Sequence, residues 1–261
     1  MRINILGFKF KYNKKSKYGM FGDYKTWQEA MKHCGAGYAG DDIIKNVLSS
    51  TIQLKKNNGK IKDHKYDFDK IKYCYNLVIC LFKIGIECGN KLNILDFGGD
   101  LGSHYFRLKN ILDPIKIEKW TVVEQEHFVK TGKEHLEDAI LNFSYSIDDV
   151  AGANVLILSG VIQYFENPYE WLEKFINKGV KYILFDRTCF NNTKRNRLTI
   201  QKVPKEIYDL SYPCWFLNEP EFLKMFEGKY ELVNDFDDIL DKANNIPSYY
   251  KGFLFKKIQN N

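Results

Sequence analysis

One stretch decides the fold of this chain: Asn93-Ile-Leu-Asp-Phe-Gly-Gly-Asp-Leu-Gly102. Apolar residues run into glycines, which predicts a short buried strand, a tight turn and a helix that begins near Ser103. Glycine has no side chain, so such a turn lets the backbone approach a ligand closely. The N-terminus of the following helix favours negative charge. The stretch therefore predicts a nucleotide-binding turn.

Strands and helices alternate after this turn. The expected strands cover residues 93–97, 120–124, 141–144, 155–158 and 182–185, and the expected helices cover 103–112, 128–136 and 168–177. Near-continuous apolar strands separated by helices predict a parallel sheet that is covered on both faces. Two later strands, 230–233 and 252–257, predict an antiparallel C-terminal edge pair. The predicted fold class is α/β, Rossmann-like, with a mostly parallel seven-stranded sheet.

The chain before the turn predicts an N-terminal helical cap over residues 1–65. Thr26-Trp-Gln-Glu29 has the form of a capping box, so a short helix should run through Met31. A second helix should follow through Val47. Residues 66–88 carry apolar residues three and four apart, which predicts a long amphipathic helix before the first strand. We expect a Rossmann-like domain over 66–261, with a structureless substrate insertion at 186–220.

Composition excludes several classes of protein. The chain has 261 residues, 44% of them hydrophobic. Its longest apolar run, Leu77–Phe82, is too short for a membrane span, and its N-terminus does not resemble a secretory signal, so we expect a cytoplasmic protein. The six cysteines form no C-x-x-C pair, which argues against zinc or a disulfide framework. Lysine-rich runs account for the net charge of +6 and do not by themselves decide the partner.

Glycine spacing separates the two cofactor classes that use such a turn. The dinucleotide fingerprint would need glycine at positions 100 and 103, where the chain has Asp100 and Ser103. This spacing argues against a nicotinamide oxidoreductase. The turn instead resembles motif I of the class I methyltransferases, D/E-x-G-x-G-x-G, with Asp100 in place of the middle glycine beside Gly99. That resemblance implies S-adenosylmethionine as the cofactor and S-adenosylhomocysteine as its product.

A carboxylate ends the second strand, about twenty residues after the turn, where a ribose would lie. Glu124 can accept both ribose hydroxyl protons there, although an exposed strand-end glutamate is the alternative. Other cofactor contacts are expected in the turn and just beyond the third and fourth strands. The predicted cofactor-binding residues are Asp96, Phe97, Gly98, Gly99, Gly102, Glu124, Ser144, Ser146, Ser159 and Gly160.

Residues 20–257 resemble a more specific family, bacterial methyltransferases found among surface-polysaccharide (lipopolysaccharide and capsule) biosynthesis genes. The resemblance is carried by residues 26–30, 37–38, 95–99, 102–106, 123–124, 159–164, 185–188, 211–213 and 251–255. It implies the cofactor better than the acceptor. The expected acceptor is a small polar molecule, with methylation at a hydroxyl of a sugar, a sugar nucleotide or a phosphorylated intermediate.

Methyl transfer to a hydroxyl requires positioning and removal of a proton. His104, two residues into the helix after the turn, is the candidate base, and Tyr164 can orient or deprotonate the acceptor. Asp186 is the third catalytic candidate, and Arg187 can clamp a carboxylate or phosphate. Capping, packing and a local ion pair are the structural alternatives. The other predicted substrate contacts are Trp27, Tyr38 and Tyr212.

Two other functions remain open. An RNA or nucleotide methyltransferase could use the basic segments, but the chain shows neither an RNA-binding signature nor an Asn/Asp-Pro-Pro-Tyr/Phe motif, which argues against nucleic acid. A non-catalytic, cofactor-binding member of the fold is the other alternative, because Asp100 departs from the motif. No metal is expected, and the partner should be a small molecule, an anionic carbohydrate or a phosphorylated compound. No feature indicates the oligomeric state.

Overall fold

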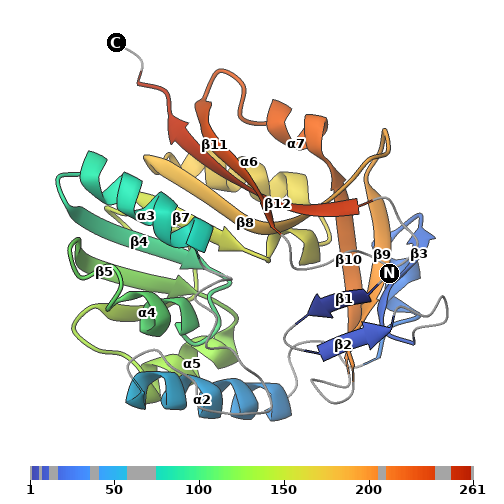
Figure 1. The fold of residues 1–261 in the computed structure, drawn as a ribbon, viewed down its shortest axis with the longest axis horizontal. Coiled ribbons are helices and arrows are strands. Elements are labelled where there is room, and N and C mark those ends of the chain that lie inside the picture. Colours follow the sequence, from blue (N-terminus) through green and yellow to red (C-terminus); the bar gives the residue numbers. More distant parts are fainter. Residues whose placement is uncertain are drawn as a thin grey trace.

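The computed structural model describes residues 2–5, 8–11, 17–35, 41–57, 75–204, 210–238 and 248–259. Within these ranges, ten strands form one continuous sheet (Figure 1). Its centre is five parallel strands in the order β6-β5-β4-β7-β8. These strands are β4 (Lys91–Phe97), β5 (Lys116–Val123), β6 (Leu141–Ser144), β7 (Val155–Ser159) and β8 (Tyr182–Asn191). The predicted parallel core is confirmed, with β6 matching the expected bounds.

The C-terminal edge is antiparallel, as predicted. β12 (Ser248–Lys257) pairs antiparallel with β8, and β11 (Tyr230–Asp238) pairs antiparallel with β12. The sheet is therefore Rossmann-like and mostly parallel at its centre, with an antiparallel pair at its C-terminal edge.

Beyond the seven expected strands, the sheet has three more. On the edge of β8 opposite β12, pairing with β7 ends at Asp186 and pairing with β10 (Ser211–Asn218) begins at Phe190. β10 also pairs with β9 (Arg197–Lys202), which pairs with β3 (Gly19–Tyr24). We call β3, β9 and β10 the cap sheet. The prediction of a structureless insertion at 186–220 is wrong, because its short strands pair with each other and with the N-terminal segment.

The predicted N-terminal cap is not purely helical. Its described part contains the hairpin β1 (Arg2–Ile5) and β2 (Phe8–Lys11), then β3, and the helices α1 (Trp27–Met31) and α2 (Asp41–Lys56). The capping box holds, because the Thr26 hydroxyl accepts a hydrogen bond from the Glu29 amide at 3.1 Å. The predicted start of the helix over 66–88 lies outside the described residues, which show α3 (Tyr75–Glu87).

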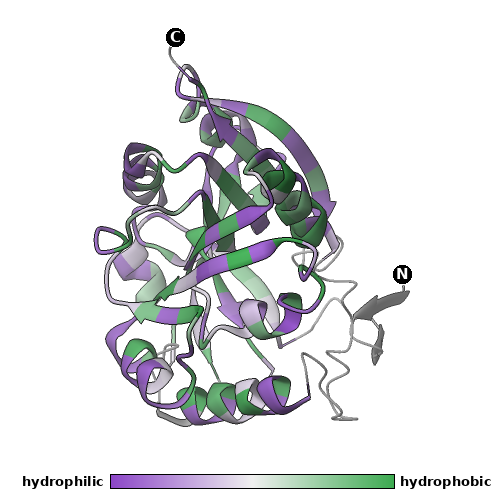
Figure 2. Ribbon diagram, turned by 90° about the vertical axis from the view of Figure 1, so that its left-hand side faces the viewer, coloured by the Kyte–Doolittle hydropathy of each residue, from purple (hydrophilic) through white to green (hydrophobic). Residues whose placement is uncertain are grey.

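Helices cover both faces of the central sheet (Figure 1). α2, α3, α4 (Ser103–Leu108) and α5 (Glu126–His135) pack on the face that includes Ile94, while α6 (Pro168–Lys178) and α7 (Glu219–Lys224) pack on the face that includes Leu95. Adjacent residues of β4 therefore enter opposite cores, as the alternation of a strand requires. The helices show both hydrophobic and hydrophilic residues around the sheet in Figure 2. Of the described helices, none is long and apolar enough to cross a membrane.

Candidate active site

A cavity of about 1460 Å³ opens beyond the carboxyl ends of β4, β5 and β7, beside the middle of β8. This is where open parallel sheets bind ligands. The structure brings most of the predicted site residues together on its wall. The predicted residues that line it are Trp27, Phe97, Gly98, His104, Glu124, Ser146, Ser159, Gly160, Tyr164, Asp186, Arg187 and Tyr212. Asp96, Gly99, Gly102 and Ser144 are not among the lining residues, and Tyr38 lies outside the described residues.

The glycine turn connects β4 to α4 along one side of the cavity. Gly98 has φ of +70°, and a Cβ atom there would come within 2.5 Å of a Val161 methyl group. Only glycine therefore fits that position without a shift of the neighbouring segment. Asp100 adopts φ of +53°, a backbone conformation that residues other than glycine rarely take. Its side chain lines the cavity, so this departure from the glycine motif places a carboxylate at the site.

Asp96 lies behind the turn and is fully buried. Its Oδ2 accepts a hydrogen bond from Trp120 Nε1 at 3.1 Å and lies within hydrogen-bond distance of His104 Nδ1, at 3.2 Å. A Cβ atom on Gly99 would lie 2.6 Å from this carboxylate, so the second glycine of the turn makes room for Asp96. The predicted cofactor contacts Asp96 and Gly99 are thus absent from the cavity wall, because Asp96 faces Trp120 and His104 and Gly99 makes room for it. His104 is mostly buried and reaches the cavity wall.

Glu124 follows β5 directly and lies on the same wall as the turn. Backbone amides of Gln125, at 2.7 Å, and of Asp100 donate hydrogen bonds to its carboxylate. Burial, reinforced by the negative charge of Asp100, raises the pKa of Glu124 to about 7 despite these amides. An ionised carboxylate at this position can accept hydrogen bonds from two hydroxyl groups of one ligand.

The loop between β6 and β7 forms the next part of the wall. The Ser144 hydroxyl donates to the Ser146 carbonyl at 3.1 Å, and the Asp148 amide donates to the Ser146 hydroxyl, also at 3.1 Å. Ser144 therefore shapes the loop while residues 145–148 line the cavity. Sequence reasoning missed Trp171 and Lys174 of α6, which also line it. Apolar periodicity placed that helix correctly but could not reveal which residues reach over the sheet edge.

On the opposite side, three polar residues form a connected group at the end of β7 and in the middle of β8. Ser159 Oγ donates to Asp186 Oδ2 at 2.7 Å and accepts from Arg187 Nη2 at 3.0 Å and Nε at 3.2 Å. Arg187 has φ of +49°, which is costly for arginine. It sits where β7 stops pairing with β8 and β10 has not yet begun. The strained backbone and the hydroxyl hold a partly exposed guanidinium on the cavity wall.

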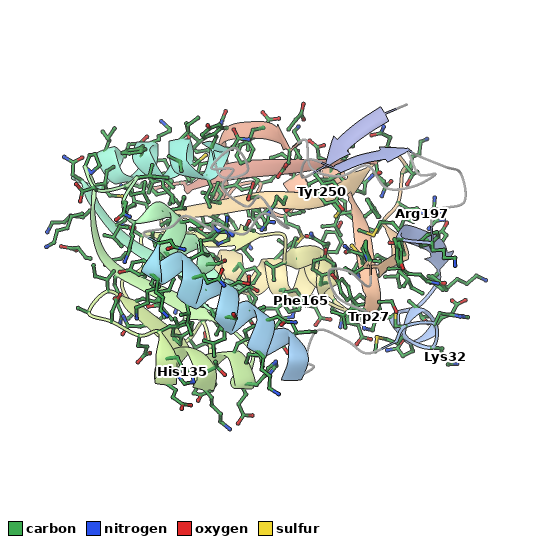
Figure 3. The ribbon with its side chains drawn as sticks, turned by 60° about the horizontal axis from the view of Figure 1, so that its bottom comes forward. Trp27, Lys32, His135, Phe165, Arg197 and Tyr250 are labelled. Carbon is green, nitrogen blue, oxygen red and sulfur yellow. The ribbon has the colours of Figure 1, made fainter. Side chains whose placement is uncertain are left out.

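An aromatic wall completes the cavity beside the cap sheet. Tyr164 and Tyr212 meet edge to face with ring centroids 5.2 Å apart. The Tyr164 hydroxyl donates to Gln201 Oε1 at 2.8 Å, and burial raises the pKa of Tyr164 well above its usual value. In this environment Tyr164 can pack against a ligand and orient it. The raised pKa disfavours the tyrosinate form, which Tyr164 would need in order to act as a base. Trp27 of α1 and Phe165, which precedes α6, line the same cavity (Figure 3).

No known family profile matches the sequence, and no curated protein is similar to it. The fold resembles solved structures at low identity. A S-adenosylmethionine-dependent methyltransferase from Clostridium acetobutylicum ATCC 824 has 11% identity and a TM-score of 0.45, over 81% of this chain and 98% of that one. Magnesium protoporphyrin IX methyltransferase from Synechocystis PCC 6803, solved with S-adenosylhomocysteine, has 12% identity and a TM-score of 0.49, over 83% and 99%.

The N-terminal domain of EvdMO1, solved in the presence of S-adenosylhomocysteine and D-fucose, has 9% identity and a TM-score of 0.49, over 86% of this chain and 100% of that one. The Synechocystis enzyme has also been solved with S-adenosylmethionine. The fold assignment itself rests on the strand order and on the turn after β4. The chain has a Rossmann-like fold, extended by the cap sheet.

Proposed function

We propose that this protein is an S-adenosylmethionine-dependent methyltransferase. The observation that carries the proposal is the position of Glu124, a carboxylate at the end of β5 that faces the same cavity as the glycine turn. Strand order and turn alone are common to many nucleotide-binding proteins. A ribose-accepting carboxylate combined with this glycine spacing favours a nucleoside cofactor without a dinucleotide phosphate bridge.

The lining residues fit that cofactor. Gly98 allows close approach of its amino-acid portion, and Glu124 offers two acceptor oxygens for the ribose. Phe97 and Ile147 supply apolar surface for the adenine, with Asp148 beside them as a hydrogen-bond acceptor. When bound, S-adenosylmethionine supplies an electrophilic methyl group on a sulfonium sulfur.

The acceptor is proposed to bind on the other side of the cavity. Its anionic group, a carboxylate or phosphate, would pair with the guanidinium of Arg187, which offers several N–H donors in one plane. The aromatic wall of Trp27 and Tyr212 would contact the apolar faces of a sugar ring. The acceptor class proposed here is an anionic carbohydrate or a phosphorylated precursor, of the kind used to build surface polysaccharides, with methylation at a hydroxyl oxygen.

His104 is the proposed general base. Its Nε2 would take the proton from the acceptor hydroxyl, while the electron pair of that O–H bond stays on the acceptor oxygen and forms the new bond to the methyl carbon. The electrons of the broken carbon–sulfur bond remain on sulfur, which becomes a thioether. The proton on His104 then passes to solvent. Charge and atoms balance without a metal ion or a redox partner.

Calorimetry with S-adenosylmethionine tests the cofactor assignment. Wild type should bind it, and Glu124→Ala should weaken binding about 10- to 100-fold, because two charge-assisted hydrogen bonds are lost. Glu126→Ala is the matched control, since Glu126 is an exposed glutamate of α5 that pairs with Lys130 at the surface. Equal affinities for wild type and Glu124→Ala would refute the ribose assignment.

A product assay separates the proposed reaction from its alternatives. Wild type is incubated with S-adenosylmethionine and, separately, with sugar nucleotides, sugar phosphates and RNA, and formation of S-adenosylhomocysteine is measured. Methylation of a phosphorylated carbohydrate is expected. Product with RNA alone would favour an RNA methyltransferase. Cofactor binding without product in any mixture would favour a non-catalytic cofactor-binding protein.

A further inference from the structure

The buried Asp96–His104 pair assigns Asp96 a role that its place in the glycine motif does not indicate. Asp96 was expected to contact the cofactor, yet its side chain is fully buried and is absent from the cavity wall. We infer that Asp96 is a positioning residue, which fixes the ring orientation and tautomer of His104 so that Nε2 serves as the base. This inference rests on the proposed methyl transfer.

The hydrogen bonds determine which nitrogen of His104 carries the proton. Oδ2 of Asp96 accepts from Trp120 Nε1, which can only donate. Because Oδ2 acts as an acceptor, its contact with His104 at 3.2 Å requires a proton on Nδ1. Nε2, on the opposite edge of the ring, is then the nitrogen with a lone pair. The His104 side chain is 11% exposed and lines the cavity, so this lone pair can reach a ligand.

The surroundings hold the pair in one arrangement. Trp120 is fully buried and packs edge to face against Tyr105, which fixes the second donor to Asp96. Gly99 leaves space for the carboxylate, which any side chain at that position would displace. His104 lies in the first turn of α4, so the helix fixes its backbone. Such support is what a catalytic side chain needs for precise geometry.

The second carboxylate oxygen of Asp96 can also stabilise a positive charge on His104. Its Oδ1 is buried and has no hydrogen-bond partner among the described residues. The negative charge is therefore neutralised by few neighbours before the reaction. When Nε2 takes the acceptor's proton, the resulting imidazolium lies against this carboxylate in a poorly hydrated site, where the attraction between opposite charges is strong. The proton moves only to Nε2, and Asp96 takes none.

The first test needs no cofactor and no turnover. Imidazole nitrogen NMR of ¹⁵N-histidine-labelled protein reports the tautomer, and loss of one signal set in His104→Gln assigns His104 among the five histidines. Wild type should show the Nδ1–H tautomer, and Asp96→Ala should lose that preference. Trp120→Phe is the control, because it removes the other donor to the same oxygen and should preserve the tautomer. An Nε2–H tautomer in wild type would overturn the inference.

The second test is a double-mutant cycle. Asp96→Ala and His104→Gln should each lower kcat by about 10²- to 10³-fold, and the double variant should be no slower than His104→Gln alone. The Kd for S-adenosylmethionine should stay within about threefold of wild type in Asp96→Ala. Multiplicative losses, or a cofactor affinity that falls with kcat, would show that Asp96 acts on folding or cofactor binding.

Two further measurements keep the outcomes distinct. If Asp96→Ala does not fold, Asp96→Asn preserves the shape of the side chain and enters the same cycle, with the same expectation and the same contradicting result. If wild type binds no S-adenosylmethionine, the proposed function fails, whereas the tautomer measurement still decides whether Asp96 orients His104.

Discussion

The two sides of the cavity are built in different ways. On the cofactor side, the wall comes from consecutive strand–turn–helix units, so that the turn after β4 and Glu124 after β5 occupy neighbouring strand ends. On the acceptor side, the cap sheet joins segments far apart in the chain, with Met20 of β3 opposite Gln201 of β9 and Gln201 opposite Tyr212 of β10. The cofactor side is thus encoded locally, and the acceptor side depends on long-range pairing.

This difference predicts that a substitution on the acceptor side can abolish acceptor binding while cofactor binding persists. The largest effect is expected at Arg187. Arg187→Met should lower kcat/KM for an anionic acceptor about 10²- to 10³-fold, because the anion loses a charged partner that can donate two hydrogen bonds. The Kd for S-adenosylmethionine should change less than threefold. Steady-state kinetics at saturating cofactor, together with calorimetry, measures both.

Arg195→Met is the matched control for Arg187→Met, because it removes an equal charge from an exposed arginine that pairs with Asp23. It should leave both kcat/KM and cofactor affinity close to wild type. A parallel loss of cofactor affinity in Arg187→Met would mean that the two sides of the cavity do not bind separately.

A core substitution in the cap sheet tests whether that sheet stabilises the whole chain. Leu198 of β9 is fully buried with Ile200 and Ala30 of α1. Leu198→Ala should lower the free energy of unfolding by about 2–5 kcal/mol through lost apolar contact and a cavity. Urea unfolding followed by circular dichroism measures this loss. A separate early transition with cofactor binding intact would show that the cap sheet unfolds independently.

The same contrast explains what the sequence could predict. The β4 turn, the capping box at Thr26 and the start of α6 at Pro168 are each set by a few adjacent residues, and each was predicted correctly. The cap sheet was not, since β9 and β10 are short and pair with β3, about 180 positions earlier for Gln201 and Met20. In β9, apolar Leu198 and Ile200 alternate with polar Arg197, Thr199 and Gln201, but this pattern is too short to indicate a strand.

Within the site, the sequence identified residue types better than roles. Glu124 was predicted from a strand end, and Arg187 was predicted to follow a strand over 182–185, whereas β8 continues through Arg187 to Asn191. The role of Asp96 could not be predicted, because the motif shows which residues surround a turn and does not show which way a side chain points. The proximity of Trp120 and His104 to that carboxylate depends on packing across β5 and α4.

The proposed contact between Glu124 and the ribose predicts that cofactor affinity depends on pH. Its pKa in the folded protein is about 7, above the ordinary value, so the protonated form is favoured in the folded state below pH 7. A ribose that needs both oxygens as acceptors binds the ionised form. Affinity should therefore fall about tenfold per pH unit below pH 7 and level off above it.

Calorimetry in two buffers of different ionisation enthalpy should show release of about one proton per cofactor bound near pH 6. Glu124→Gln should bind more weakly and without this pH dependence. A flat profile in wild type would place the cofactor away from Glu124, and would remove the main evidence that distinguishes the cofactor side of the cavity.

The smallest effect on stability is expected for the ion pair between Asp23 of β3 and Arg195, which lies in the loop before β9. Arg195 donates to both oxygens of Asp23, and this hydrogen-bonded pairing lowers the pKa of Asp23. The Arg195 side chain is 65% exposed, so water screens the pair. Asp23→Asn should therefore reduce stability by less than about 1 kcal/mol at pH 7.

A lowered pKa means that this contribution is present above the ordinary pKa of aspartate, near 4, and is lost as pH falls through the folded value. Thermal melts of wild type and Asp23→Asn should consequently converge in acid and in high salt. If Asp23→Asn instead lost as much stability as Leu198→Ala, charge rather than apolar packing would hold β3 on the cap sheet. The long-range pairing that distinguishes the acceptor side would then depend on a single surface contact.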